Sequence, residues 1–193
     1  GVPAAPMAAG AQGAWRSPEA RPLTCRPMSE RTVILEHEQV QRKLRRIAHQ
    51  LHEEHHEAGA LVLVGIAPRG AILAKRLARL LEEVSDLRID LVELKLDKDL
   101  PLERPVQLSI DPMSLRDRLV VLVDDVLMSG RTLMHAASYL VQAPLKRLTT
   151  VVLVDRRHRA YPIRADIVGL TLSTTLQEHI SVELGRKDAV YLS

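Results

Sequence analysis

The sequence is poor in aromatic residues, with no Phe, one Trp and three Tyr. A core in this chain must therefore be built from Leu, Val, Ile and Ala. The single cysteine, Cys25, excludes a disulfide framework within the chain and fits a reducing compartment, so we expect a cytoplasmic protein. No apolar run approaches the roughly 18 residues of a membrane-spanning helix, which predicts no membrane association. The net charge of +3 does not by itself indicate nucleic acid binding.

Two common nucleotide-binding patterns are also absent. The spacing from Gly65 to Gly70 suits G-x-x-x-x-G-K-[ST], but Ala71 stands where the pattern requires Lys. No G-x-G-x-x-G occurs either. A P-loop and a dinucleotide-binding fingerprint are therefore excluded.

Composition divides the chain near residue 27. Residues 1–27 are rich in Ala, Gly and Pro and have no periodic apolar pattern, so we expect a disordered N-terminal segment. The sequence leaves open whether this segment belongs to the native protein, because Met28 is a candidate start. Residues 28–193 are long enough for one ordinary domain and too short for two large ones.

From Met28 onward, strand and helix patterns alternate, which predicts an α/β fold with an open, mostly parallel sheet flanked by helices. Apolar runs predict strands over 33–35, 61–66, 89–96, 119–123, 148–154 and 167–170. Helical spacing predicts helices over 36–57, 71–81 and 133–141. Residues 97–118 contain three Pro and predict a long loop of the kind that often forms an active-site lid. A terminal hairpin is expected around Gly185.

The most informative stretch is residues 119–132, where an apolar strand runs into two adjacent carboxylates. The run from Leu119 to Val123 has no alternation, which indicates a strand covered on both faces. Asp124 and Asp125 follow at its carboxyl end, the edge where open α/β sheets bind ligands. Neighbouring strand residues point to opposite sides, so the two can act as a pair only where the strand ends. Carboxylates accept hydrogen bonds from vicinal hydroxyls, so this pair suits a sugar.

A polar turn then leads from Met128 into the predicted helix. Backbone N–H groups at a helix start are unpaired, and the helix dipole adds positive potential, so this position suits an anion. Ser129 and Thr132 supply hydroxyl donors, and Gly130 lets the backbone approach closely. The acid pair and the turn together suit a 5-phosphoribosyl group, which carries sugar hydroxyls and a phosphate at a fixed distance. The alternative is a buried strand with an ordinary polar turn.

A second candidate turn runs from Gly65 to Gly70. It also follows a buried strand and opens a helix, and Arg69 adds a donor suited to an anion. Taken alone, an ordinary turn between strand and helix is the better explanation. Beside a phosphoribosyl site, the turn suits the pyrophosphate that a phosphoribosyl donor carries.

Two further patterns have simpler explanations. The stretch from His52 to His56 matches H-E-x-x-H, which is typical of zinc proteases. It lies in a very polar last helical turn with no recognisable third ligand, which favours a solvated helix end.

A basic cluster suits a phosphate or RNA contact, a subunit contact or a solvated rim. The cluster comprises Arg156, Arg157, His158, Arg159 and Arg164.

The strand, acid pair and turn resemble the ribose-phosphate motif of the type I phosphoribosyltransferases, and wider segments resemble one family among them. Segments 33–49, 73–78, 153–159 and 162–166 are similar to PyrR. That family comprises pyrimidine-operon attenuation regulators that also have uracil phosphoribosyltransferase activity. The similarity extends over about residues 31–184. It implies a type I phosphoribosyltransferase fold with a small hood over the base site.

The resemblance implies a role for each motif toward the donor, phosphoribosyl pyrophosphate (PRPP). Asp124, Asp125 and Arg69 would be the catalytic residues, with the two aspartates on the ribose hydroxyls. Arg69, Gly70 and the lid residue Lys98 would bind the pyrophosphate end. The 5-phosphate would lie on Met128, Ser129, Gly130, Arg131 and Thr132. Mg²⁺ would accompany the donor.

The segment from Val154 to Asp166 would form the hood over the base, largely through backbone groups. Its base-binding residues would be Val154, Asp155, Arg156 and Ile163. Several positions depart from the family pattern, among them Ser129 in place of Thr and Lys98 in a shorter lid. Met128 stands where the family has Tyr, and Arg157 where it has Gly. Leu170 and Arg45 replace a Lys and a Thr in regions that the family uses for RNA, which argues against RNA-dependent regulation.

Two functions therefore stand as hypotheses. The first is an enzyme that joins a nucleobase to PRPP, with uracil the leading base and a purine base the alternative. The second is a regulator of pyrimidine genes that binds RNA and has weak or no catalysis. The resemblance also implies a homodimer or a higher homo-oligomer.

Overall fold

The computed structural model describes residues 1, 31–97, 105–157, 159–173 and 178–193. The predicted N-terminal segment therefore lies outside the described residues apart from Gly1, and so do Lys98 and His158. Among the helices that are described, none is both long enough and apolar enough to cross a membrane.

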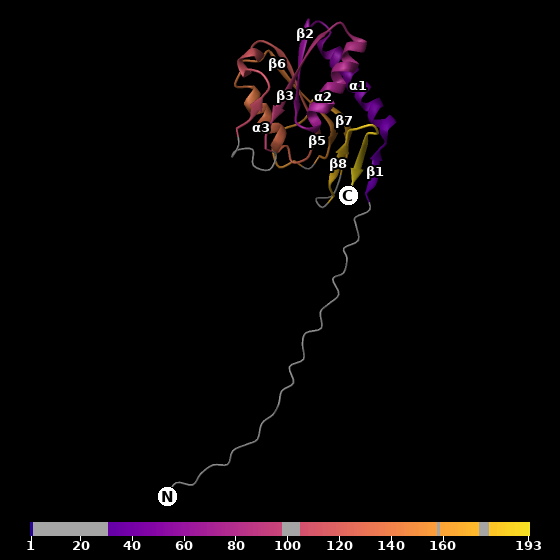
Figure 1. The fold of residues 1–193 in the computed structure, drawn as a ribbon, viewed down its shortest axis with the longest axis vertical. Helices are drawn as coiled ribbons and strands as arrows, with labels where there is room; N and C mark the ends of the chain where they lie inside the picture. Colours follow the sequence, from indigo (N-terminus) through magenta and orange to yellow (C-terminus); the bar gives the residue numbers. More distant parts are fainter. Residues whose placement is uncertain (2–30, 98–104, 158, 174–177) are drawn as a thin grey trace.

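The fold is built on a six-stranded sheet with the strand order β4-β3-β2-β5-β6-β7. Figure 1 labels five of these strands, all except β4. All neighbours in the sheet are parallel except β4, which pairs antiparallel with β3 at one edge. This arrangement confirms the predicted open, mostly parallel sheet. Its strands are β2 (Ala60–Ile66), β3 (Arg88–Lys95), β4 (Gln107–Leu108), β5 (Leu119–Leu127), β6 (Arg147–Asp155) and β7 (Ile167–Thr171).

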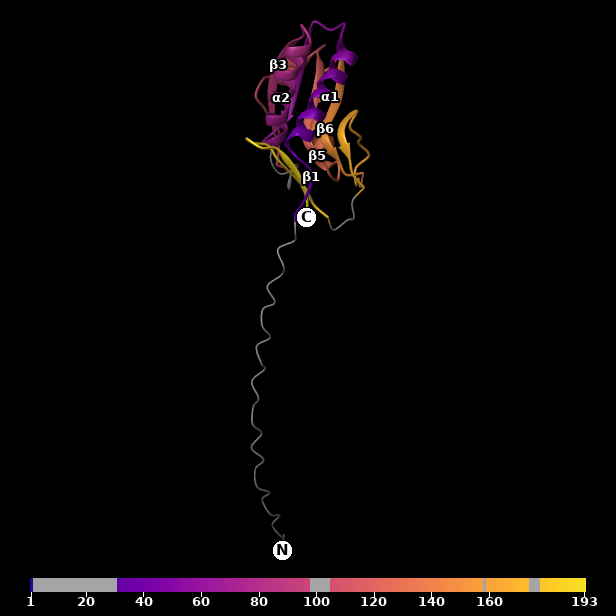
Figure 2. The same cartoon turned by 90° about the vertical axis from the view of Figure 1, so that its right-hand side faces the viewer.

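Helices cover both faces of this sheet (Figures 1 and 2). On one face, α1 (His37–His55) and α2 (Arg69–Val84) form a core with alternate residues of β2 and β5. On the other face, α3 (Arg131–Leu140) packs on the intervening residues of the same strands. Coverage on both faces explains why these strands are continuously apolar, since every side chain meets a core.

A second, three-stranded sheet joins the two ends of the described domain. Its order is β1-β9-β8, with antiparallel pairing throughout. The strands are β1 (Thr32–Leu35), β8 (Ile180–Glu183) and β9 (Ala189–Leu192). The predicted terminal hairpin is confirmed as β8–β9, and β1 adds to it as a third strand.

The predicted long loop is partly ordered. It contains β4, which pairs with the end of β3, and a 3₁₀ helix at Pro112–Leu115. Residues 98–104 lie outside the described residues, so the lid remains a prediction.

Two predicted boundaries beside the acid pair were wrong. The strand predicted to end at residue 123 continues to Leu127, because β6 pairs alongside it as far as Asp155. On its other side, the pairing with β2 stops at Val123. The helix predicted from residue 71 begins at Arg69, directly after a cis Ala67–Pro68 peptide. Arg69 and Gly70 are therefore the first residues of α2.

Candidate active site

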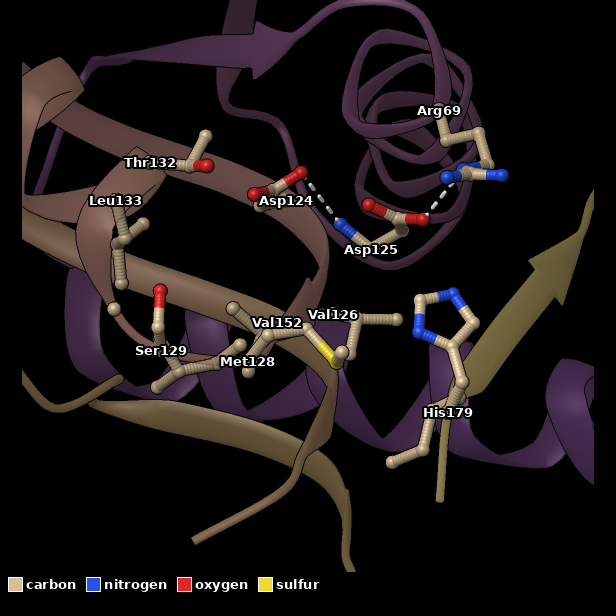
Figure 3. A pocket seen from close by; sticks show the side chains of 13 residues that line it. Arg69, Asp124, Asp125, Val126, Met128, Ser129, Thr132, Leu133, Val152 and His179 are labelled. Atoms are coloured by element: carbon tan, nitrogen blue, oxygen red, sulfur yellow. Dashed lines mark hydrogen bonds and ion pairs between the residues drawn. The ribbon is translucent and has the colours of Figure 1, made fainter. Parts of the chain in front are cut away.

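A cavity of about 470 Å³ lies at the carboxyl end of β5, beside the first turns of α2 and α3 (Figure 3). The carboxyl edge of a parallel sheet is the usual ligand-binding edge of such folds. The walls come from parts of the chain that are distant in sequence: α2, β5 and its following turn, β6 and the start of β8. The lining residues are Arg69, Asp124, Asp125, Val126, Leu127, Met128, Ser129, Gly130, Thr132, Leu133, Val152, His179 and Ile180.

The acid pair lies inside β5, at the point where that strand loses β2 as a neighbour. Asp124 and Asp125 are 2% and 3% exposed, yet both line the cavity. One carboxylate oxygen of Asp124 accepts the backbone N–H of Asp125 at 3.0 Å. The two carboxylates are thus covered by protein but face the space that a ligand would fill (Figure 3).

Arg69 brings a positive charge to the acid pair. Its Nε lies 2.7 Å from Oδ2 of Asp125, while the Arg69 side chain remains 48% exposed. The guanidinium stands in the first turn of α2, where unpaired N–H groups and the helix dipole also favour an anion. One side of the cavity therefore combines a buried carboxylate with an accessible cation.

Gly70 lets the first turn of α2 come close to β5. A Cβ at this position would lie 2.5 Å from the carbonyl oxygen of Val123 and 3.1 Å from Cα of Asp124. Only glycine fits against backbone at such a distance. The position of Arg69 beside the acid pair depends on this close approach.

The turn after β5 presents backbone donors to the opposite side of the cavity. Gly130 is the N-cap of α3 and has a φ of 85°, a left-handed conformation that favours glycine. Gly130 has no side chain to cap α3, and the first turn of this helix carries no acidic residue. Apart from the N–H of Arg131, which donates to Ser129, the N–H groups of this helix start are therefore available to an anion, next to the hydroxyls of Ser129 and Thr132. Arg131 does not line the cavity, although its backbone N–H approaches Oγ of Ser129 at 3.3 Å.

The predicted hood segment is anchored on this turn. The carbonyl oxygen of Ser129 accepts N–H groups from Ala160 at 2.9 Å and from Tyr161 at 3.0 Å. The N–H of Arg156 donates to the carbonyl of Leu127 at 3.0 Å. The loop after β6 and the turn after β5 thus form one unit.

The predicted base-binding residues lie behind the turn and do not line the cavity among the described residues. The Val154 side chain is fully buried in the core. Asp155 accepts the N–H of Arg157 at 3.0 Å and pairs with Arg159. Ile163 lies on the turn, with its Cγ2 only 2.9 Å from where a Cβ of residue 130 would be. Contact of these residues with a base remains a prediction.

His179 and Ile180 were not predicted as site residues. They enter the cavity from the start of β8, about fifty positions after the acid pair. No local pattern marks them, because their place depends on how the second sheet packs against β5.

The H-E-x-x-H pattern forms no metal site within the described residues, where no group of three or more metal-binding side chains occurs. Nδ1 of His56 faces the carbonyl of Glu53 at 2.9 Å, and the ring is exposed. The expectation of a solvated helix end therefore holds for His56, whereas the neighbouring His55 is buried.

Comparison with known proteins assigns the family. The model of the phosphoribosyl transferase domain matches residues 30–187. The chain is 41% identical over 162 residues to Bifunctional protein PyrR of Streptomyces coelicolor, covering 80% of this chain and 84% of that one. It is 37% identical over 170 residues to Bifunctional protein PyrR of Bacillus subtilis, covering 83% and 94%. The chain belongs to the PyrR-like type I phosphoribosyltransferases.

Solved structures confirm the fold of this PyrR-like chain. The hypoxanthine phosphoribosyltransferase of Trypanosoma cruzi superimposes with a TM-score of 0.64 at 19% identity, covering 73% of this chain and 81% of that one. A hypoxanthine-guanine phosphoribosyltransferase of Bacillus anthracis gives 0.62 at 20% identity, covering 74% and 83%. At such identities the likeness shows the fold, and the choice of base is a separate question.

Proposed function

We propose that this protein transfers the 5-phosphoribosyl group of PRPP to a nucleobase, with uracil as the leading base and UMP and pyrophosphate as the products. The observation that carries the proposal is the cavity itself. It places the acid pair between a cationic helix start at Arg69 and an uncapped helix start at Gly130. These are the complementary groups for a ribose that carries a phosphate at one end and a pyrophosphate at the other.

The donor would lie across the cavity. Its 5-phosphate would accept N–H groups of residues 128–132 and the hydroxyls of Ser129 and Thr132. Its ribose hydroxyls would donate to Asp124 and Asp125, whose negative charge keeps phosphates away from that part of the cavity. Its pyrophosphate would lie on the first turn of α2, at Arg69 and Gly70, where Lys98 of the lid would join it.

The residues present fit Mg²⁺ as a companion of the donor. This ion prefers carboxylate and phosphate oxygens and is often held by one or two carboxylates together with substrate phosphates. Asp124 and Asp125 are the carboxylates of the cavity lining and would be the protein's contribution. When bound, the ion would neutralise charge on the departing pyrophosphate.

Transfer breaks the bond from C1 of the ribose to pyrophosphate and forms a bond from C1 to a ring nitrogen of the base. Positive charge develops on the sugar while the leaving group departs. The buried carboxylates of the acid pair would stabilise that charge, since electrostatic interactions are strong in a site that excludes water. Arg69 would assist the leaving group, and the protein would hold base and sugar in line.

Uracil leads because the chain resembles PyrR over most of its length. A purine base is the alternative, since Arg157 of the hood and the lid around Lys98 depart from the PyrR pattern. From the same resemblance we propose a homodimer or a higher homo-oligomer in the cytoplasm. Light scattering that shows a stable monomer would contradict that assembly.

A nucleotide-formation assay with Mg²⁺-PRPP and separate bases tests the proposal. Uracil, hypoxanthine, guanine and adenine are supplied in turn, and the product is resolved by chromatography. We expect UMP, and we expect the Asp124→Asn and Asp125→Asn variants to lose turnover by a hundredfold or more, on the order found for removal of transition-state electrostatics. A purine nucleotide would reassign the base. No product with any base, together with tight salt-dependent binding of pyrimidine-leader RNA, would favour the regulator instead.

A further inference from the structure

The proposed donor leaves one part of the cavity unassigned. Once phosphate, ribose and pyrophosphate are placed, the remaining lining is apolar apart from a single imidazole. The lining residues without an assigned role are His179, Val126, Leu127, Leu133, Val152 and Ile180. Apolar walls with one convergent polar group suit a flat heteroaromatic ring whose edge needs a hydrogen bond.

We propose that His179 is the side chain that recognises the edge of the base, an assignment that rests on the proposed function. Its ring faces the cavity on the side of Asp125 and Arg69, away from Ser129 and Thr132 (Figure 3). Since C1 of the ribose carries the pyrophosphate proposed to lie at Arg69, C1 would lie at this end of the cavity. A neutral imidazole has one donor and one acceptor nitrogen, which matches the neighbouring N–H and C=O groups on the edge of a base. The base would lie against this ring and the apolar side chains of Val126 and Ile180.

The backbone of His179 is fixed in place. Its N–H donates to the carbonyl of Ser193 at 2.7 Å, and the N–H of Ser193 donates back to the carbonyl of His179 at 3.0 Å. This reciprocal pair continues the β8–β9 ladder to the point where β8 meets the cavity. The imidazole therefore projects from an ordered strand end.

The β8–β9 hairpin is in turn tied to the helix that carries Arg69. Asp188, between the two strands, is buried and accepts hydrogen bonds from Gln41 of α1 and Arg76 of α2. Arg76 also donates to the carbonyl of Gly185 at 3.1 Å. These contacts fix the position of β8 relative to α2. A side chain that recognises a ligand needs such fixed surroundings.

Ligands that share the ribose 5-phosphate and differ in the base test this assignment. Binding of ribose 5-phosphate, UMP and GMP to the full-length protein is measured by calorimetry for the wild type, His179→Ala and His179→Gln. We expect His179→Ala to weaken binding of the preferred nucleotide by roughly three- to tenfold, the value of one hydrogen bond. Binding of ribose 5-phosphate should not change. His179→Gln, whose amide keeps a donor and an acceptor, should recover part of the loss.

The exposed His49 on α1 provides a matched control, and His49→Gln should bind all three ligands as the wild type does. Equal weakening of ribose 5-phosphate and nucleotide by His179→Ala would assign His179 to the sugar-phosphate or to structure and overturn the inference. Unchanged nucleotide binding would also overturn it. A wild type that binds none of the three ligands would instead refute the proposed function, and the inference with it.

Discussion

Single residues set how closely the walls of the cavity approach, and Gly70 is the clearest case. A methyl group there would meet the Val123 carbonyl at 2.5 Å. We expect Gly70→Ala to displace the start of α2, to lower the free energy of unfolding by about 1–3 kcal/mol and to weaken PRPP binding. Urea unfolding and PRPP titration check both effects. Gly59→Ala is the control, because no heavy atom lies within 4 Å of a Cβ there, and equal effects of the two substitutions would contradict the account.

Arg157 carries backbone strain in the loop after β6. Its φ is +66°, a conformation that side chains with a Cβ rarely adopt. The PyrR pattern has Gly at this position, which fits the same backbone without strain. We expect Arg157→Gly to raise the free energy of unfolding by about 1 kcal/mol, measured by urea unfolding. Arg156→Gly is the control, because Arg156 has no positive φ, and it should not raise the free energy of unfolding. If Arg157→Gly lowers the free energy of unfolding as much as Arg156→Gly does, the contacts of the Arg157 side chain outweigh the backbone strain.

At the scale of elements, Asp188 joins the terminal hairpin to both helices on its side of the sheet. Burial by itself would raise the pKa of Asp188, but hydrogen bonds from Arg76 and the Gly185 N–H, with the charges of Arg76 and His37, bring the pKa below its usual value. The folded state therefore favours the ionised carboxylate. We expect Asp188→Asn to lower the free energy of unfolding at neutral pH by about 2–4 kcal/mol, because a buried ion pair loses one partner.

The pH dependence of this loss has a definite sign. A carboxyl with a depressed pKa stabilises the fold above the unfolded value of about 3.9 and loses that contribution as pH falls through the folded value. The difference in thermal stability between wild type and Asp188→Asn should thus be full at neutral pH and shrink below about pH 4. A difference that stays constant into that acid range would exclude the ion pair as its source.

The order and type of the elements could be predicted from the sequence, because apolar periodicity reports which faces are buried. Strand ends were less predictable, since they depend on the neighbouring strand. β5 extends to Leu127 because β6 pairs with it along this length. The sequence of β5 alone does not indicate where this pairing ends. The start of α2 was missed for a similar reason, as Arg69 and Gly70 pack against a strand more than fifty residues away.

The residues of the candidate site also differ in whether the local sequence could predict them. The acid pair and the turn after β5 lie within one short stretch, so their place at one site could be predicted from neighbouring residues. His179 could not, because only the packing of the hairpin against β5 brings it to the cavity. The base-binding role of Val154 and Ile163 rested on resemblance and remains a prediction.

Considered as a whole, the molecule places a buried histidine at the end of the sheet opposite the candidate active site. His55, at the end of α1, lies with Lys146 and Arg147 around a different cavity, at the start of β6. The candidate active site lies at the opposite, carboxyl end of the sheet. Burial lowers the pKa of His55 and the charge of Arg147 lowers it further, while Glu54 acts in the other direction.

The lowered pKa of His55 predicts that the protein loses thermal stability in mild acid, and the responsible group lies far from the candidate active site. The unfolded chain binds a proton at His55 below about pH 6.5, whereas the folded protein keeps the ring neutral until its lowered pKa is reached. Thermal stability should therefore fall as pH drops through this window, and His55→Gln should reduce the slope. His49→Gln, at an exposed histidine, should leave the slope as it is. Identical slopes for wild type and His55→Gln would remove His55 as the cause.

We infer that the carboxylates of β5 bind a ribose whose phosphate lies on the turn beyond them. Calorimetric titration of Mg²⁺-PRPP into the wild type and the Asp124→Asn/Asp125→Asn double variant measures this binding. We expect the wild type to bind PRPP and the variant to bind it at least about tenfold more weakly, since two hydrogen bonds to charged acceptors are lost. The thermal midpoint should show that the variant is folded. Equal PRPP affinity in the two proteins, or no binding to the wild type, would contradict the claim.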